Sequence, residues 1–241
     1  LATVAKERKA WEKELDGWTH ERDAYSLEVA KESKYMHPRQ VLRELEKAMP
    51  ARAMVSTDIG NICSISNSYL RFNEPRSMFA AMSFGNCGYA FPTIIGAKLA
   101  APERPAIAYV GDGAWGISFN EVQTCVRENI PVTAIVFNNG QWGAEKKNHV
   151  DFYNRRYLGV ALDNQPHWAN VAIAMGAEGL RIDRLEDVGP ALSAACEAQK
   201  RGKTTIIEIM VTKELGDPFR RDALALPTRF LPKYKHTEIK R

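Results

Sequence analysis

Two polar motifs, Gly111-Asp112-Gly113 and Asn138-Asn139, each follow an apolar run in this sequence of 241 residues. The two runs, 106–110 and 132–137, favour β-strands, and one helix-like segment separates them. This pattern predicts a βαβ unit, in which the carboxyl ends of both strands reach the same edge of the sheet. Asp112 and Asn139 lie 27 positions apart in the sequence but should therefore meet. Two side-chain oxygens beside a helix N-terminus suit a hard divalent cation and a phosphate group.

Three turns should face one crevice, because open α/β sheets bind ligands outside the carboxyl ends of their strands. In the turn at 111–116, the backbone N–H groups of Gly113 and Ala114 and the dipole of the following helix can hold a diphosphate. In the turn at 58–61, Gly60 lets the backbone approach a phosphate and Asn61 can donate to it, although a plain glycine turn fits equally well. The third turn runs from 84 to 88.

The spacing of the two motifs, GDG followed by 24 residues and NN, resembles the signature of the thiamin-diphosphate-dependent enzyme family. The alternative is an ordinary turn with a capping Asp. The resemblance implies that the side chains of Asp112 and Asn139 and the main-chain oxygen of Gln141 hold Mg2+, which grips the diphosphate. The residues that we assign to cofactor binding on this basis are Gly60, Asn61, Gly85, Asn86, Cys87, Gly111, Asp112, Gly113, Ala114, Asn139, Gln141, Trp142 and Gly143.

Cys87 departs from the pattern of the family. The resemblance implies that the carbonyl group of Gly85 meets the aminopyrimidine and that a bulky apolar residue two positions later wedges the cofactor into its bent form. Cys87 is smaller than the usual Met, Leu or Ile. Phe84 or Met82 could fill the space instead, the alignment could be shifted by one residue, or Cys87 could be a buried structural cysteine. Met82 and Phe79 themselves are predicted to belong to the core.

Segments 72–92, 138–160 and 222–235 resemble one branch of that family more closely. This branch converts sulfoacetaldehyde and phosphate into acetyl phosphate and sulfite, so the resemblance implies an acyltransferase with small anionic substrates. Two alternatives remain open. The chain could belong to a decarboxylating carboligase or lyase of the acetolactate-synthase type, or it could be a cofactor-binding module without chemistry of its own.

The resemblance also implies partners. In the family, a Glu on a pyrimidine-binding domain of the same or a neighbouring subunit activates the cofactor, and no segment upstream of residue 35 could be that domain. The catalytic residue is therefore not assigned. We expect a homodimer or homotetramer, in which this chain supplies the half of the site that holds diphosphate and Mg2+. The chain alone should be inactive.

Anionic substrates need fixed cations beyond the metal. The segment after Asn139 carries five candidates within eleven residues, and Arg suits bidentate capture of a sulfonate or phosphate better than Lys does. Arg155 and Arg156 are therefore the first choices, and a solvated run of charges is the alternative. The full set of candidates is Lys146, Lys147, His149, Arg155 and Arg156.

Composition excludes several other classes of protein. The net charge of +4 comes from the tail 212–241, which holds eight Lys and Arg against four Asp and Glu, and no motif for nucleic-acid binding accompanies it. No apolar run approaches the length of a membrane span, and the N-terminus lacks a signal-peptide pattern. The four cysteines have no CxxC spacing, which is typical of reduced thiols in a cytoplasmic protein. The histidines form no HExxH pair, which argues against zinc.

Alternating strands and helices predict an α/β fold, a doubly wound and mostly parallel sheet of about six strands with helices on both faces. The expected strands are 53–57, 106–110, 132–137, 178–182 and 204–211, with a short apolar piece at 78–82. The expected helices are 38–49, 62–70, 91–99, 168–175 and 186–199, of which 91–99 is apolar nearly all round and should be buried. Residues 148–165 are predicted to form a long functional loop.

The predicted organisation has three parts: a helical linker at 1–34, the thiamin-diphosphate-binding domain at 35–212, and a tail at 213–241 that packs on the surface. Residues 1–34 carry fifteen charged side chains, yet large apolar residues recur at helical spacing, and this stripe should pack against the domain or a partner chain. No initiator Met precedes it, so we expect a piece of a longer polypeptide. The stripe consists of Val4, Trp11, Leu15, Trp18, Tyr25 and Val29.

Overall fold

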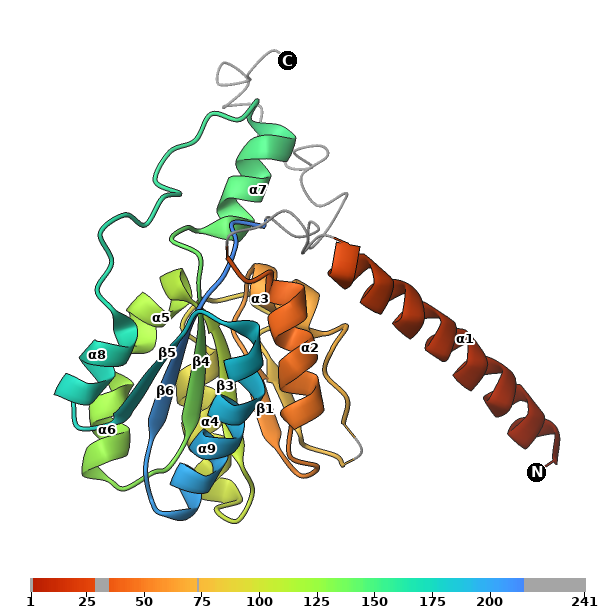
Figure 1. Ribbon diagram of the computed structural model, residues 1–241, viewed down its shortest axis with the longest axis horizontal. Helices are drawn as coiled ribbons and strands as arrows, with labels where there is room; N and C mark the ends of the chain where they lie inside the picture. The colour runs from red at the N-terminus through yellow and green to blue at the C-terminus, as the bar shows by residue number, and fades with distance from the viewer. Residues whose placement is uncertain (1, 29–34, 73, 215–241) are drawn as a thin grey trace, which may run out of the picture.

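The computed structural model describes residues 2–28, 35–72 and 74–214 (Figure 1). Their centre is one sheet of six strands in the order β2-β1-β3-β4-β6-β5, and every neighbouring pair is parallel. The predicted doubly wound sheet of about six strands is confirmed. The strands are β1 (Met54–Thr57), β2 (Met78–Ala80), β3 (Ala106–Gly111), β4 (Thr133–Asn138), β5 (Glu178–Ile182) and β6 (Thr205–Met210).

Helices cover both faces of the sheet (Figure 1). Alternate residues of each strand point to opposite faces, so Ile107 and Tyr109 pack on one face while Ala108 and Val110 pack on the other. Helices α2 (Pro38–Ala48), α3 (Asn61–Ser66) and α9 (Val188–Lys200) cover the first face. Helices α4 (Ala90–Ala100), α5 (Asp112–Ser118), α6 (Glu121–Arg127) and α8 (Trp168–Ala174) cover the second.

The strand order changes direction at β1. The chain passes from β1 to its neighbour β2 and then returns to β3 on the other side of β1. Helices on opposite faces therefore leave a crevice outside the carboxyl ends of β1 and β3, where open α/β sheets bind their ligands. The turns that the sequence singled out all lie after strands at this edge.

Helix α1 (Ala2–Glu28) projects away from the sheet (Figure 1). The domain covers its predicted stripe only in part: the Trp11 and Trp18 side chains are 59% and 55% exposed, whereas Leu15 is half-buried and the Tyr25 ring lies 5.2 Å from the guanidinium group of Arg39 on α2. Val29 lies outside the described residues. The prediction of a helix is confirmed, and the domain covers part of the stripe; packing of the rest against a partner chain, the other alternative, stays a prediction.

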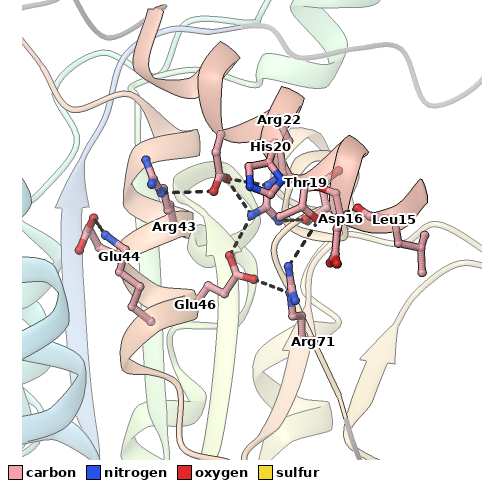
Figure 2. A network of polar contacts seen from close by, with 12 residues as sticks. Leu15, Asp16, Thr19, His20, Arg22, Arg43, Glu44, Glu46 and Arg71 are labelled. Atoms are coloured by element: carbon pink, nitrogen blue, oxygen red, sulfur yellow. Dashed lines mark hydrogen bonds and ion pairs between the residues drawn. The ribbon is translucent and has the colours of Figure 1, made fainter. Parts of the chain in front are cut away.

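Polar side chains of α1 also contact the domain (Figure 2). The guanidinium group of Arg22 lies 3.2 Å from the Glu46 carboxylate, donates to the Ser68 carbonyl group and stacks 4.3 Å from the centre of the Tyr69 ring. Arg71 approaches the same Glu46 carboxylate to 2.9 Å. These contacts join α1 to α2 and to the segment that follows α3.

Three local predictions need correction. Helix α4 is not buried all round: Phe91 and Ile94 face the sheet, whereas Leu99 is exposed. The segment predicted as a loop at 148–165 begins inside helix α7 (Gly143–Phe152), none of whose residues is fully buried. The single helix expected between β3 and β4 is divided into α5 and α6 at Phe119 and Asn120.

The remaining elements follow the predicted ranges closely. A short 3-10 turn, η1 (Leu185–Asp187), precedes α9. Within the ranges listed above, no helix combines the length and the apolar character that a membrane crossing requires. The predicted tail falls outside the described residues from position 215 onward.

Candidate functional site

A cavity of about 300 Å3 opens where the strand order changes direction. Its walls come from the segments that follow β1, β2, β3, β4 and β6, with further residues from α2, α3 and α7. All the residues that the sequence assigned to cofactor binding line this cavity, with the exception of Asn86. The additional lining residues are Pro38, Ile59, Ile62, Ile65, Phe137, Ala144, Glu145, Lys147, Asn148, Val211 and Glu214.

Asp112 and Asn139 meet at the edge of the sheet, as their spacing predicts. Asp112 is 3% exposed, and its Oδ2 accepts hydrogen bonds of 2.8 Å from the backbone N–H of Gly140 and 2.8 Å from Nε2 of Gln165. Asn139 Oδ1 accepts from the backbone N–H of Gln141 at 3.1 Å. Asp112, Asn139 and Gln141 thus all line the same cavity.

The chemistry of this edge fits a hard cation. Burial raises the pKa of Asp112, while hydrogen bonds from Gln165 and from the backbone of Gly140 and Gly113 oppose that rise. No salt bridge among the described residues involves Asp112, so its buried carboxylate has no cationic partner from this part of the chain. The same residues contain no cluster of three His, Cys, Asp or Glu side chains, so a softer metal finds no such set of ligands here.

Close packing leaves the start of α5 open to the cavity. A Cβ atom at Gly113 would lie 2.9 Å from the indole ring of Trp142, and one at Gly143 would lie 2.7 Å from Nδ2 of Asn61. The backbone of Gly113 therefore approaches the cavity without a side chain between them. Backbone N–H groups at the start of a helix are donors suited to a phosphate group, and in this structure that of Gly113 donates to the Asp112 carboxylate.

Asp58 organises the turn after β1, a role that the sequence did not reveal. Its fully buried carboxylate accepts backbone hydrogen bonds of 3.0 Å each from Ile59, Gly88 and Ala90. Burial raises the pKa of Asp58, and these backbone bonds oppose the rise. The contacts fix the 85–90 segment against the end of β1. Gly60, in the same turn, has φ 115° and ψ −163°, a conformation open almost only to glycine.

Cys87 lines the cavity, whereas Phe84 and Met82, which could have filled the space in its place, do not. Phe84 is 91% exposed and Met82 is also exposed, so the prediction that Met82 belongs to the core is wrong, whereas Phe79 does pack against the core. Burial raises the pKa of the Cys87 thiol to about 11, with smaller contributions from Asp58 and Glu145. Cys87 is therefore a neutral thiol at pH 7.

The basic candidates lie on or just after α7, above the carboxyl edge of the sheet (Figure 1). Only Lys147 lines the cavity, and its Nζ forms a salt bridge of 2.6 Å with Asp151. Lys146 donates to Gln141 Oε1 at 3.1 Å, and His149 packs edge-on against Tyr153. Arg155 and Arg156, the first choices from the sequence, are exposed and do not line the cavity.

Comparison with known proteins gives the family. Residues 58–209 match the family described as "Thiamine pyrophosphate enzyme, C-terminal TPP binding domain". The chain belongs to this family. Thiamine pyrophosphate, or thiamin diphosphate, is the cofactor of the family, and the matched range spans most of the segments that line the cavity.

Two curated relatives are much more similar than the family as a whole. The chain is 68% identical to the sulfoacetaldehyde acetyltransferase of Alcaligenes xylosoxydans xylosoxydans and 65% identical to that of Castellaniella defragrans. Each alignment covers 97% of this chain but 40% of the relative, so the chain spans less than half the length of these proteins.

A solved structure supports the fold. The thiamine diphosphate-dependent 4-hydroxybenzoylformate decarboxylase of Rhodococcus jostii RHA1 superposes with a TM-score of 0.70 at 22% identity. The match covers 76% of this chain and 34% of that chain. At this identity the likeness shows the fold alone.

Proposed function

We propose that this chain supplies the diphosphate-binding and Mg2+-binding half of an enzyme that converts sulfoacetaldehyde and phosphate into acetyl phosphate and sulfite. The observation that carries the proposal is the cavity at the carboxyl ends of β1, β3 and β4, where Asp112 and Asn139 meet. The two relatives with 68% and 65% identity, both named sulfoacetaldehyde acetyltransferase, support the choice of substrate.

In this proposal, Mg2+ is held by the side chains of Asp112 and Asn139 and by the carbonyl group of Gln141. Oxygen ligands of this kind suit Mg2+, which usually takes one or two carboxylates and completes its shell with water and phosphate oxygens. The backbone N–H groups of Gly113 and Ala114, at the start of α5, donate to the diphosphate. Gly85 and Cys87, which also line the cavity, would lie against the aminopyrimidine.

Thiamin diphosphate, when bound, supplies the electron sink that makes cleavage beside the carbonyl carbon of the substrate possible. The residues of this chain bind and orient it. Cys87 contributes bulk rather than a nucleophile, because its raised pKa keeps the thiol protonated at neutral pH. Lys147, the one basic candidate that lines the cavity, attracts the anionic substrates and takes the place that the sequence gave to Arg155 and Arg156.

The proposal includes partners and a location. A pyrimidine-binding domain of the same or a neighbouring subunit carries the activating Glu and completes the site, in a homodimer or homotetramer. We place the enzyme in the cytoplasm, because its four cysteines are free thiols. Neither nucleic acid nor a membrane has a role in the proposed function.

The function is tested by incubating the protein, together with its pyrimidine-binding domain, with sulfoacetaldehyde, phosphate, Mg2+ and thiamin diphosphate. Equal amounts of acetyl phosphate and sulfite are expected, and the 241-residue chain alone should form neither. Release of CO2 from pyruvate without any release of sulfite would overturn the proposal in favour of a decarboxylating enzyme. Cofactor binding without either reaction would favour a binding module.

A further inference from the structure

A buried carboxylate outside the cavity lies on the strand next to the metal-binding turn. Glu208 on β6 is 1% exposed, and no salt bridge involves it within the described ranges. Its Oε1 accepts a hydrogen bond of 2.8 Å from Nδ2 of Asn138. Its Oε2 accepts one of 3.2 Å from the backbone N–H of Ala169, near the start of α8. A charge at this depth is costly unless its bonds serve the fold or the site.

Two chains of hydrogen bonds, here called arms, connect Glu208 with Asp112. The first arm runs through the turn at 138–140. Asn138 uses its amide group to donate to Glu208 and its Oδ1 to accept from the backbone N–H of Gly140 at 3.2 Å. The same N–H lies 2.8 Å from Asp112 Oδ2. Glu208 therefore sets the amide orientation of Asn138, and Asn138 helps to hold the Gly140 N–H that points at Asp112.

The second arm reaches Asp112 from the other side. Trp168 donates from Nε1 to Gln165 Oε1 at 2.9 Å, which fixes the Gln165 amide so that its Nε2 donates to Asp112 Oδ2 at 2.8 Å. Trp168 precedes Ala169, whose N–H is bound to Glu208. The two arms thus close a ring, the Asp112 ring, which consists of Asp112, Asn138, Gly140, Gln165, Trp168, Ala169 and Glu208.

We propose that Gln165 and Glu208 are positioning residues for the metal site, acting through the Asp112 ring. The inference rests on the proposed function, because it assumes that Asp112 is a ligand of Mg2+. Both arms end on Oδ2, so together they restrict the rotation of the Asp112 carboxylate in the residue that lines the cavity. Groups that orient a metal ligand in this way commonly change metal affinity 10- to 100-fold when they are removed.

A purely structural role for Glu208 is the competing explanation, since it also caps the start of α8. Gln165 separates the two explanations, because it is only half-buried and, within the described residues, its side chain forms hydrogen bonds with Asp112 and Trp168. The structural explanation predicts that Gln165→Ala leaves Mg2+ binding unchanged. The positioning explanation predicts a loss of affinity without a loss of stability.

The experiment measures Mg2+ affinity by calorimetry in the presence of thiamin diphosphate, and the melting temperature of the metal-free protein, for the intact protein and its variants. Gln165→Ala should weaken Mg2+ binding about tenfold and leave the melting temperature unchanged. Gln40→Ala is the matched control: Gln40 is half-buried on α2 and lies outside the cavity lining, so both quantities should stay at the wild-type value.

Glu208→Gln tests the far side of the ring. The carbonyl oxygen of the new amide can still accept one of the two hydrogen bonds. Its NH2 group, however, faces a second donor, at Asn138 or Ala169, so that bond is lost. Mg2+ affinity should therefore fall in this variant as well. Because both substitutions act on Asp112, the loss of Mg2+ binding free energy in the double variant should be smaller than the sum of the losses in the two single variants.

An unchanged Mg2+ affinity in Gln165→Ala, or a decrease that the Gln40→Ala control shares, would overturn the positioning role while the proposed function stands. A decrease in Mg2+ affinity that is accompanied by a lowered melting temperature would overturn the positioning role too. If the wild-type protein binds no Mg2+ with thiamin diphosphate, the proposed function fails and the inference fails with it.

Discussion

At the scale of single residues, the shape of the site depends on Gly113, a position without a side chain. Gly113 follows Asp112 at the start of α5, and the Trp142 indole covers the position that its side chain would take. The glycine lets the backbone and the ring pack together, which keeps the N–H groups of the first turn of α5 beside the cavity. The space in which a diphosphate would bind therefore depends on having glycine rather than alanine at position 113.

We predict that Gly113→Ala destabilises the protein by about 1–3 kcal/mol, the usual cost of forcing extra carbon into a packed site. The new Cβ would lie 2.9 Å from the Trp142 ring, so the ring or α5 must move, and affinity for thiamin diphosphate should fall. Denaturant unfolding and calorimetry measure the two effects.

Gly116→Ala is the control for this prediction. Gly116 lies on the same helix, and nothing is found within 4 Å of a Cβ atom built there. That variant should keep wild-type stability and cofactor affinity. If Gly113→Ala and Gly116→Ala behave alike, the close packing of Gly113 does not shape the site.

The sequence predicted these residues unevenly. Asp112 and Asn139 were predictable because each directly follows a strand, and parallel strands bring their carboxyl ends together. Gln165 was not, because it reaches Asp112 from 53 positions away and comes from a segment without periodicity. Glu208 and Asp58 looked like ordinary polar residues, since their burial and their hydrogen bonds arise only once the sheet is assembled.

At the scale of elements, α7 is a helix that the sequence pattern did not predict. None of its residues is fully buried, so it presents no apolar stripe, and its sequence is that of a polar loop. Its helical form brings Lys147 to the cavity, while Arg155 and Arg156 follow after the helix has ended at Phe152. Charge density alone did not predict which cation faces the site.

We predict that Lys147→Ala raises the KM for phosphate or sulfoacetaldehyde about tenfold, the value of one charge-assisted hydrogen bond. Affinity for thiamin diphosphate should not change. Arg156→Ala is the control, because that side chain is exposed and does not line the cavity. A larger effect on either KM from Arg156→Ala than from Lys147→Ala would restore the arginine as the anion site.

Helix α2 begins at a histidine that responds to pH. His37 is buried at the N-cap of α2, with Nε2 3.1 Å from the Glu214 carboxylate. Burial lowers the pKa of His37 below its ordinary value of 6.5, although Glu214 opposes this effect and Arg39 adds to it. The folded state thus binds this proton less tightly than the unfolded state does.

Because the unfolded state binds more protons near pH 6, this histidine should make the folded state less stable as the pH falls below 6.5 toward its lowered folded pKa. We predict that His37→Asn, which retains an N-cap side chain, reduces the loss of unfolding free energy between pH 7 and pH 5. Urea unfolding at the two pH values measures this loss. An identical pH dependence in the variant and the wild type would contradict the assignment.

At the scale of the whole molecule, the fold followed from the alternation of strands and helices, and the position of the cavity followed from the strand order. The packing of α1 could not be predicted in this way. Its aromatic stripe indicated a buried face, yet Trp11 and Trp18 remain exposed, while Arg22 forms an ion pair with Glu46 and donates to the Ser68 carbonyl group. Periodicity predicts that a helix has an apolar face but not what covers that face.

The central claim is that the edge formed by Asp112 and Asn139 binds thiamin diphosphate through Mg2+. The most direct measurement is a calorimetric titration of thiamin diphosphate into the intact protein, with and without Mg2+, for the wild type and for Asp112→Ala. Binding to the wild type should require Mg2+, and Asp112→Ala should abolish it, since Mg2+ would lose the one carboxylate of its proposed ligand set. An unchanged, Mg2+-dependent affinity in Asp112→Ala would contradict the claim.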